Sequence, residues 1–552
     1  MASEPTTTKP PSLASQVSRA VVWNTLFVPL RLVAEALSTL VKLNRLSLAS
    51  FGLLAMVSGA SNMFGTGIDL GTTRALPKYI PETDRAGGAL ATMRLLQLVF
   101  AAQMAVLLLV AAGLIIFQPA FLAYLRGMVL GDERIDGPAQ DQLLAFVTNY
   151  GWLLAVTVVA LLFFGVCYDM LMAYLSSFFR QRAWNSIDLA AKVLPQLLIV
   201  GAILAGWDIL GVLGAMVLAP AIAVALATWQ VSRLRRELRS AEAPAAPVAA
   251  PPLREWRRWL PPGFVRYSGV SFLMTATDLI ASVNFAIFLA GDLGDVAVLW
   301  AGSALVRMAL SYLYTPMVGV QVPLFARVRQ GEGGTLNGAY QSLVRLQLLL
   351  LVPGGAGLML LAEPALLVIS PQYLVAAPIV WVLVPCLFVE CLLTTAHNAL
   401  IVYERLPIIV ASRLIILLVV APLAWLLPSA AGLVGVALAF GLARVAAGLW
   451  VTGSGMRLLG LRWPWRFTAR VVGATAAMAA LILATRGLLP PLPATAGLAE
   501  RLREAGLLMG MAALGALAFF GALRLLGGLD EQDRAQLARM RLPLKRWLLK
   551  VL

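Results

Sequence analysis

FGLLAMVSGASNMFGTGIDLGTTRALPKYIPETDR, residues 51–85, joins an apolar run to a glycine-rich end and a basic exit. The apolar run, Phe51 to Leu70, has about 20 residues, enough for one helical crossing of a hydrocarbon layer about 30 Å thick. Three cations follow in what we expect to be a short loop, namely Arg74, Lys78 and Arg85. Loops rich in Lys and Arg tend to stay on the cytoplasmic side, so this loop predicts the orientation of its helix.

The composition of the whole chain has the same apolar character. Of its 552 residues, 60% are hydrophobic and only 13% are charged, whereas an average soluble domain is about 25% charged. A soluble fold could not cover so much apolar surface with so few polar residues. The apolar runs are continuous, which disfavours a transmembrane barrel built from alternating strands of about ten residues. The sequence therefore predicts an all-α polytopic membrane protein.

The net charge is +16, from 43 Lys plus Arg and 27 Asp plus Glu. Most of the cations lie in loops, where they fix the topology and meet anionic lipid headgroups. No basic patch alternates with exposed aromatic residues, so we expect membrane lipids as partners and no nucleic acid. Cys167, Cys386 and Cys391 form no C-x-x-C motif, and His397 is the single histidine. We therefore expect no metal site and no other cofactor.

About fourteen windows are long and apolar enough to span a membrane. They lie near residues 17–41, 51–70, 90–117, 148–174, 187–206, 209–229, 265–289, 296–320, 343–362, 375–396, 408–427, 430–451, 468–485 and 507–526. Lys and Arg are concentrated in alternate loops, and the loops after the fifth, seventh, ninth and eleventh spans contain none. This bias places both termini in the cytoplasm.

An Ala-, Pro- and Arg-rich segment, residues 233–263, divides the chain and suits a semi-rigid cytoplasmic linker. Short matches recur in the same order on both sides of it, such as Leu76–Tyr79 with Val322–Phe325 and Gly211–Ala215 with Gly432–Val436. Such a repeat predicts two six-helix bundles related by a pseudo-two-fold axis, followed by two C-terminal helices. The predicted domains are a cytoplasmic tail (1–16), an N-terminal bundle (17–232), the linker (233–263), a C-terminal bundle (264–455), two additional transmembrane helices (456–527) and an amphipathic cationic tail (528–552).

Residues 48–82, LASFGLLAMVSGASNMFGTGIDLGTTRALPKYIPE, resemble the segment around the second helix of bacterial polysaccharide and O-antigen flippases. These flippases belong to the multidrug/oligosaccharidyl-lipid/polysaccharide exporter superfamily. The matching positions are Phe51, Gly52, Gly67, Gly71, Arg74 and the run from Pro77 to Glu82. GLVGVALAF at Gly432 is similar to the family's twelfth helix, whereas the long third loop and the long linker depart from the pattern. The resemblance implies two bundles around a central cleft, and export of a polyprenyl-diphosphate-linked glycan precursor.

Of the cations within predicted spans, where a charge costs about 2.5–3.5 kcal/mol on insertion scales, four are candidates for a binding role. Arg307 has no acid within one helical turn and needs a partner on another helix or an anion in a cavity, which we favour. Arg31 shares a helical face with Glu35, so an internal ion pair is an equal alternative to a binding role. Lys192 and Arg413 occupy near-equivalent repeat positions but could also extend to the cytoplasmic interface. Together the four could form a cationic cleft for a diphosphate, whose oxygens match guanidinium donors.

Three acids lie deepest in the spans: Asp169, Asp278 and Glu390. One role open to them is to neutralise the arginines, and the other is to couple transport to protons or sodium ions. Asp278 is of most interest, because the seventh helix should line the cleft.

These observations predict a flippase for polyprenyl-diphosphate-linked oligosaccharides in the bacterial inner membrane, working by alternating access. Its partners would be the lipid-linked glycan, membrane lipids and polysaccharide assembly proteins. The sequence has no Walker motif and no nucleophile–base cluster, so it does not predict an enzyme. One alternative is a multidrug/cation antiporter of the same fold, which needs an acidic cleft. Another is a membrane-embedded glycosyltransferase or polymerase, which needs clustered catalytic residues.

Overall fold

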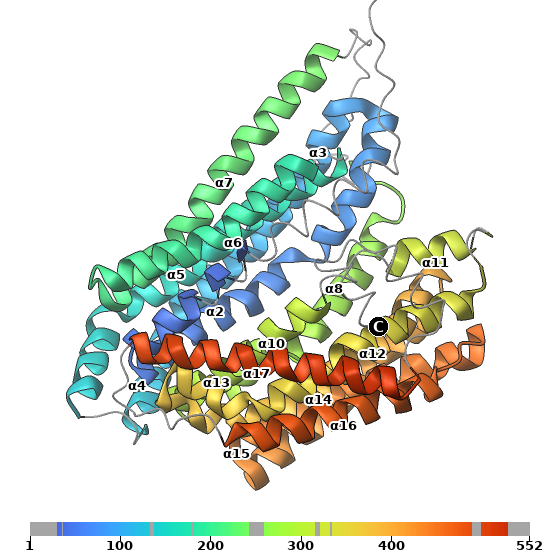
Figure 1. The fold of residues 1–552 in the computed structure, drawn as a ribbon. Coiled ribbons are helices and arrows are strands. Elements are labelled where there is room, and N and C mark those ends of the chain that lie inside the picture. Colours follow the sequence, from blue (N-terminus) through green and yellow to red (C-terminus); the bar gives the residue numbers. More distant parts are fainter. Residues whose placement is uncertain are drawn as a thin grey trace, which may run out of the picture. The chain divides into compact units, whose positions relative to one another are not determined.

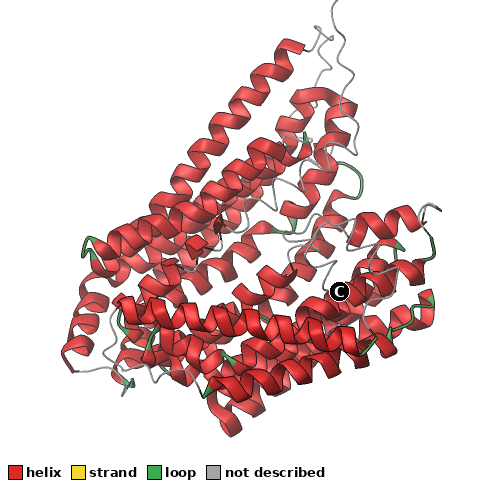
Figure 2. Cartoon of the chain, in the orientation of Figure 1, coloured by secondary structure: helices red, strands yellow, loops and turns green. Residues whose placement is uncertain are grey.

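A computed structural model describes residues 30–527, except 32, 36, 133–136, 179–180, 242–258, 315–320, 330, 332–333 and 488–497. Every regular element in these described residues is a helix, as Figure 2 shows, so the predicted all-α fold is confirmed. Four predicted features lie outside the described residues: the tail 1–16, the start of the first span, the centre of the linker and the cationic tail 528–552.

The helices are drawn in Figure 1. The longer ones are α2 (Leu48–Asp69), α3 (Thr72–Ile116), α5 (Gly137–Ser177), α6 (Gln181–Leu204), α7 (Asp208–Ala241), α10 (Leu293–Tyr314), α12 (Leu336–Leu360), α14 (Ala377–Val402), α15 (Leu406–Leu459), α16 (Trp465–Arg486) and α17 (Leu498–Leu525). The shorter ones are α4 (Gln118–Leu130), α8 (Phe264–Ile280), α9 (Val283–Ala286), α11 (Gln321–Arg329), α13 (Ala362–Ile369) and the 3-10 helices η2 (Ile287–Leu289) and η4 (Pro371–Ala376).

Ten helical stretches in the described residues are long and apolar enough to cross a membrane, or eleven when the bent pair α8–α9 counts as one. Two of these stretches contain breaks. Leu48–Ile116 turns at Gly71 and again at Gly88, and α15 has non-helical backbone angles at Ala431 and Gly432. Two predicted spans can therefore belong to one helical stretch. The protein is a multi-pass membrane protein, while the count of fourteen spans and the pseudo-two-fold axis stay predictions.

The basic segment after α2 is helical, so the expectation of a short loop carrying Arg74, Lys78 and Arg85 is wrong. The chain turns within two residues, Leu70 and Gly71, whose φ angles are 53° and 73°. A left-handed pair of this kind breaks the hydrogen-bond ladder without a longer loop, and α3 begins directly after it.

A side-chain cap explains why the helix restarts so quickly. Asp69 Oδ1 accepts the Thr73 backbone N–H at 2.9 Å and the Thr73 hydroxyl at 2.5 Å. A carboxylate at this position satisfies a free N–H and lies at the positive end of the helix dipole. The helix then continues until Gly88, whose φ of 67° and ψ of −169° are not helical.

Two further segments expected as loops are helical in part. α4 fills Gln118–Leu130 and α5 begins at Gly137, which shortens the predicted third loop. Between them Asp132 is 1% exposed, and its Oδ2 accepts the Gly294 N–H at 2.8 Å. Gly294 is in the first turn of α10, where a negative charge is favourable. α7 likewise runs to Ala241, beyond the predicted start of the linker at residue 233.

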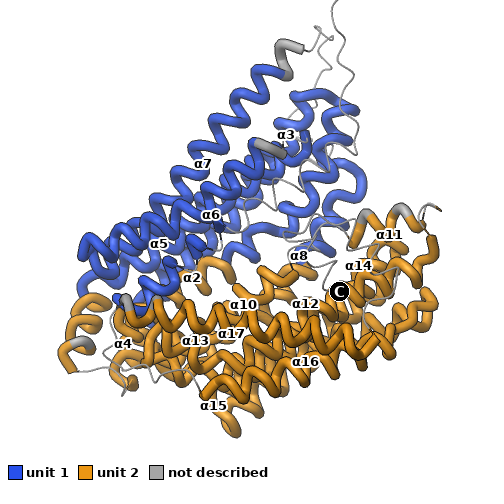
Figure 3. Tube along the Cα trace, viewed as in Figure 1, with its two compact units in different colours: residues 1–45, 64–121, 149–272 blue, residues 46–63, 122–148, 273–552 orange. Residues whose placement is uncertain are grey.

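The chain divides into two compact units, coloured in Figure 3. Unit 1 comprises Met1–Arg45, Phe64–Phe121 and Asn149–Phe272, and unit 2 comprises Leu46–Met63, Leu122–Thr148 and Leu273–Leu552. The core of unit 1 includes Tyr79, Leu95 and Phe264, each at most 5% exposed. In unit 2, α14 and α15 approach closely at Gly441. A Cβ there would lie 2.8 Å from Cys386 Sγ, so the helices can pack this closely because glycine has no side chain. The predicted domain boundaries, which follow the chain order, stay a prediction.

The turn at Gly71 gives a test of this packing within unit 1. A Cβ there would lie 2.2 Å from the Ser268 carbonyl oxygen and 2.5 Å from the Phe272 nitrogen. We expect Gly71→Ala to lower the free energy of unfolding by about 2 kcal/mol or more, from overpacking and the positive φ. Thermal unfolding of the purified protein in detergent measures the change. Gly67→Ala is the control, because its Cβ meets open space inside a helix, and an equal loss in both variants would contradict the expectation.

Candidate functional site

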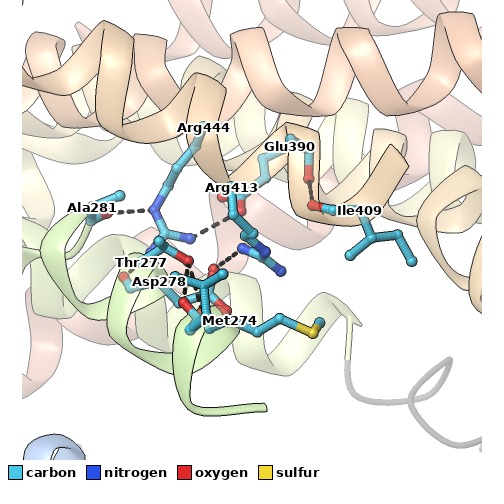
Figure 4. A network of polar contacts seen from close by, with 10 residues as sticks. Met274, Thr277, Asp278, Ala281, Glu390, Ile409, Arg413 and Arg444 are labelled. Carbon is cyan, nitrogen blue, oxygen red and sulfur yellow. Dashed lines mark hydrogen bonds and ion pairs between the residues drawn. The ribbon is translucent and has the colours of Figure 1, made fainter. Parts of the chain in front are cut away.

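The candidate site lies in unit 2, where α8 breaks. α8 ends at Ile280 and α9 starts at Val283, with a bend of 57° between them. The last carbonyls of a helix have no partner within it, and an unpaired carbonyl is costly away from water. Arg444 supplies the missing donors: its Nε donates to the Ala281 oxygen at 2.5 Å and its Nη2 to the Asp278 carbonyl oxygen at 2.9 Å (Figure 4).

Two carboxylates complete the site. Glu390 on α14 accepts from Arg444 Nη1 at 2.9 Å, and the Asp278 carboxylate accepts from Arg413 Nη1. Arg413 lies before the break in α15 and Arg444 lies after it. We call these four residues the arginine–carboxylate network, which joins α8, α14 and both arms of α15.

The network is half-buried and balances two cations with two carboxylates. The Arg413 and Arg444 side chains are 12% and 19% exposed, and those of Asp278 and Glu390 are 36% and 28% exposed. Removing one member of such a pair leaves an uncompensated charge, which is far more costly than the net contribution of the intact pair. Arg413 Nε is buried and donates to no acceptor in the described part of the chain. The network therefore contains one unsatisfied buried donor.

Two other predicted cations form pairs within their own helices. Arg31 Nε lies 2.8 Å from Glu35 Oε1, which is the internal ion pair that the spacing allowed. Lys192 Nζ lies 2.5 Å from Asp188 Oδ2 on α6. All four side chains are between 23% and 41% exposed, and pairs of this spacing contribute about 0.3–0.5 kcal/mol on a solvated helix.

Arg307 on α10 has a different environment. Its guanidinium carbon lies 4.9 Å from the centroid of the ring of Trp300, which precedes it on the same helix. No acid in the described residues forms an ion pair with it. A ring face attracts a cation by about 0.5–2 kcal/mol, which is less than a carboxylate partner supplies at the same depth.

Asp169 on α5 also has no ion pair or hydrogen bond with the described residues, and its side chain is exposed. The charged group that acts on it is a second carboxylate, Asp69 at the end of α2. Both lie in unit 1.

The structure thus brings three of the predicted residues together, namely Asp278, Glu390 and Arg413. The acids Asp278 and Glu390 neutralise arginines, which is one of the two roles left open for them. The described contacts connect none of the other four predicted residues to the network: Arg31, Lys192, Arg307 and Asp169. Sequence reasoning missed Arg444, although it lies inside the predicted span 430–451 and its charge there was a sufficient signal. Substrate binding and ion coupling by these residues stay predictions.

No protein-family model matches this chain, and no curated protein matches it. Solved structures do match. The lipid II flippase MurJ in its inward closed conformation has a TM-score of 0.63 at 11% identity, over 90% of this chain and 98% of that one. An inward-facing multidrug resistance MATE transporter of the MOP superfamily has a TM-score of 0.53 at 14% identity, over 78% and 95%. A MOP superfamily transporter from Pyrococcus furiosus, whose binding pocket has reverse polarity, has a TM-score of 0.51 at 14% identity, over 80% of this chain and 95% of that one.

At these identities the likeness shows the fold. The chain has the fold of MOP superfamily transporters, over nearly the full length of each matched structure. This is the superfamily to which the segment 48–82 pointed, while the narrower family of polysaccharide and O-antigen flippases stays a prediction.

The network gives a graded series of stability losses. We expect Glu390→Gln to lower the free energy of unfolding by about 1–3 kcal/mol, because Arg444 loses a charged acceptor. Arg444→Met should cost more, since it also leaves the carbonyls of Asp278 and Ala281 without donors. The double variant should not recover stability, because those carbonyls stay unpaired. Thermal unfolding in detergent measures each change.

The matched control is Glu404→Gln. Glu404 pairs with Arg329 at 3.0 Å but is 74% exposed, and such surface pairs contribute about 0–1 kcal/mol. If Glu390→Gln cost no more than Glu404→Gln, the network would have no structural role at the α8 break.

Proposed function

We propose that this chain is a flippase that moves polyprenyl-diphosphate-linked oligosaccharides across the bacterial inner membrane. Its fold supports a membrane transporter, since the flippase MurJ and the MATE transporters share it. MurJ itself acts on a lipid, lipid II. A lipid-linked substrate that carries a diphosphate needs a cation at membrane depth.

The observation that carries the proposal is the environment of Arg307. A cation in the middle of a span costs about 2.5–3.5 kcal/mol on insertion scales. The Trp300 ring offsets only part of that cost, and the described acids offset none of it by an ion pair. A diphosphate would supply the missing charge through paired hydrogen bonds to the guanidinium.

The remaining predicted residues have two roles in this proposal: the cations bind the diphosphate and the acids couple transport to its energy source. Arg31 and Lys192 hold intrahelical partners, Glu35 and Asp188, which a diphosphate would have to displace. Arg413 contacts Asp278, and a diphosphate could reach its buried, unpaired Nε only if the surrounding side chains moved. Transport would proceed by alternating access, driven by an ion gradient or the membrane potential, with Asp169, Asp278 and Glu390 as the groups available for coupling. Both termini would be cytoplasmic, and polysaccharide assembly proteins would be partners.

Replacing Arg307 tests the proposal. We expect Arg307→Gln to reduce flipping of a polyprenyl-diphosphate-linked oligosaccharide by roughly 10- to 100-fold, the worth of a charge-assisted hydrogen bond of about 1.5–3 kcal/mol. Arg307→Lys should retain part of the activity, because it keeps the charge without the paired donors. Proteoliposomes loaded with a labelled glycan lipid measure the rate.

Arg405→Gln is the control, because Arg405 is exposed at the start of α15 and carries no side-chain cap bond there. Flipping at the wild-type rate in Arg307→Gln would remove Arg307 from the mechanism and leave the flippase proposal without its main support.

Asp169 favours a second candidate, a multidrug/cation antiporter. An exposed carboxylate on a candidate span suits an ion or a cationic substrate better than a diphosphate. Under this candidate, Asp169→Asn should abolish proton- or sodium-driven efflux of an organic cation such as ethidium from loaded vesicles. Under the flippase proposal, the wild-type protein shows no such efflux, so the wild-type measurement alone separates the two.

A further inference from the structure

The connection between α15 and α16 carries a feature that transport of a glycan lipid does not explain. Residues 457–467 read RLLGLRWPWRF, and we call them the tryptophan–arginine loop. The loop joins two helices that are each long and apolar enough to cross a membrane, so it must lie at a membrane surface. Gly460 ends α15 with a φ of 65°, and α16 starts at Trp465.

The backbone of the loop is fixed from both sides by the start of α12. The Arg462 N–H donates to Asn337 Oδ1 at 2.7 Å, and the Arg462 carbonyl accepts from Gln341 Nε2 at 3.1 Å. Leu461 and Phe467 are both 3% exposed and anchor the loop in unit 2. The position of the loop is therefore set by tertiary contacts rather than by its own sequence alone.

Several side chains of the loop, on both sides of Leu461, are exposed. Arg457, Arg462 and Arg466 are all exposed, and none forms an ion pair with a described acid. Other arginines of unit 2 do have acid partners: Arg329, Arg413, Arg444 and Arg486. Two large apolar side chains of the same loop are also exposed, Leu458 at 55% and Trp465 at 71%.

This combination fits the boundary of a lipid bilayer. A tryptophan prefers the headgroup level, where its ring is apolar and its N–H is wet. A guanidinium group can donate two parallel hydrogen bonds to the oxygens of one phosphate. The negative surface potential of an anionic leaflet also attracts the arginines. No side chain among the described residues caps the first turn of α16. The start of the helix also carries the positive end of the α16 dipole, which adds a positive partial charge at the same place.

We propose that the tryptophan–arginine loop is a binding site for the phosphodiester headgroup of an anionic phospholipid. Arg457, Arg462 and Arg466 contact the headgroup, and Leu458 and Trp465 lie against the glycerol and the upper acyl chains. Three exposed guanidiniums without acid partners supply the charge complementarity. The contacts from Asn337 and Gln341 hold the central arginine in place before the lipid arrives, which lowers the ordering cost of binding.

Native mass spectrometry of the purified full chain in detergent tests the site. Phosphatidylglycerol and phosphatidylcholine are added separately at the same molar ratio, and the bound population of each is measured. We expect the triple variant Arg457→Gln/Arg462→Gln/Arg466→Gln to bind phosphatidylglycerol at least about tenfold more weakly than the wild type, at about 1 kcal/mol for each cation near an anionic surface. Phosphatidylcholine binding should not change.

The matched control removes the same number of charges from exposed arginines of unit 1, as Arg74→Gln/Arg85→Gln/Arg236→Gln. It should bind phosphatidylglycerol as the wild type does. An equal loss in the control would show a general charge effect and overturn the proposal, as would wild-type binding in the loop variant. Inorganic phosphate is the third arm: if it raised the unfolding temperature as much as phosphatidylglycerol does, the ligand would not be a lipid. If the triple variant does not elute from a size-exclusion column as the wild type does, it is misfolded. The single variant Arg462→Gln then replaces it and must still weaken lipid binding.

Discussion

The need to pair every polar group at membrane depth is the constraint on which this structure depends. Breaking a helix inside an apolar layer frees carbonyl groups that water cannot reach. α8 is broken in this way, and Arg444 from another helix takes up the freed carbonyls. The arginine brings a charge of its own, which Glu390 balances. One local irregularity therefore requires a cation, then an anion, and so ties three helices to each other.

Apolar length predicts much of the fold, because each membrane crossing must be long, apolar and helical whatever its neighbours are. The places where the sequence misled are the breaks. The basic segment after Leu70 reads as a loop, since glycine and cations accumulate there, but a two-residue turn capped by Asp69 lets the helix resume. The segment between the third and fourth predicted spans also reads as a loop, but α4 occupies part of it. Turn signals locate such interruptions but do not give their length.

The candidate site could be predicted in part. The Arg31–Glu35 pair follows from spacing on one helix, a local rule that a sequence displays directly. The contact between Arg413 and Asp278 joins residues 135 positions apart, and the contact between Arg444 and Glu390 joins residues 54 apart. Only the packing of α8, α14 and α15 decides such partners. For Arg307 the sequence showed that no acid lies within one helical turn. The structure adds a neighbour that sequence reasoning did not identify, the ring of Trp300 on the same helix.

α15 has a break at Ala431 and Gly432, and the two arginines that hold the end of α8 lie on opposite sides of it. The angle of that break sets how the two arms that carry these guanidinium groups lie relative to each other. A change of the angle would stretch at least one of their contacts unless α8 adjusted as well. The conformations of the two helices are thus linked thermodynamically, so a ligand that prefers one shape of α8 must also shift the distribution of angles in α15.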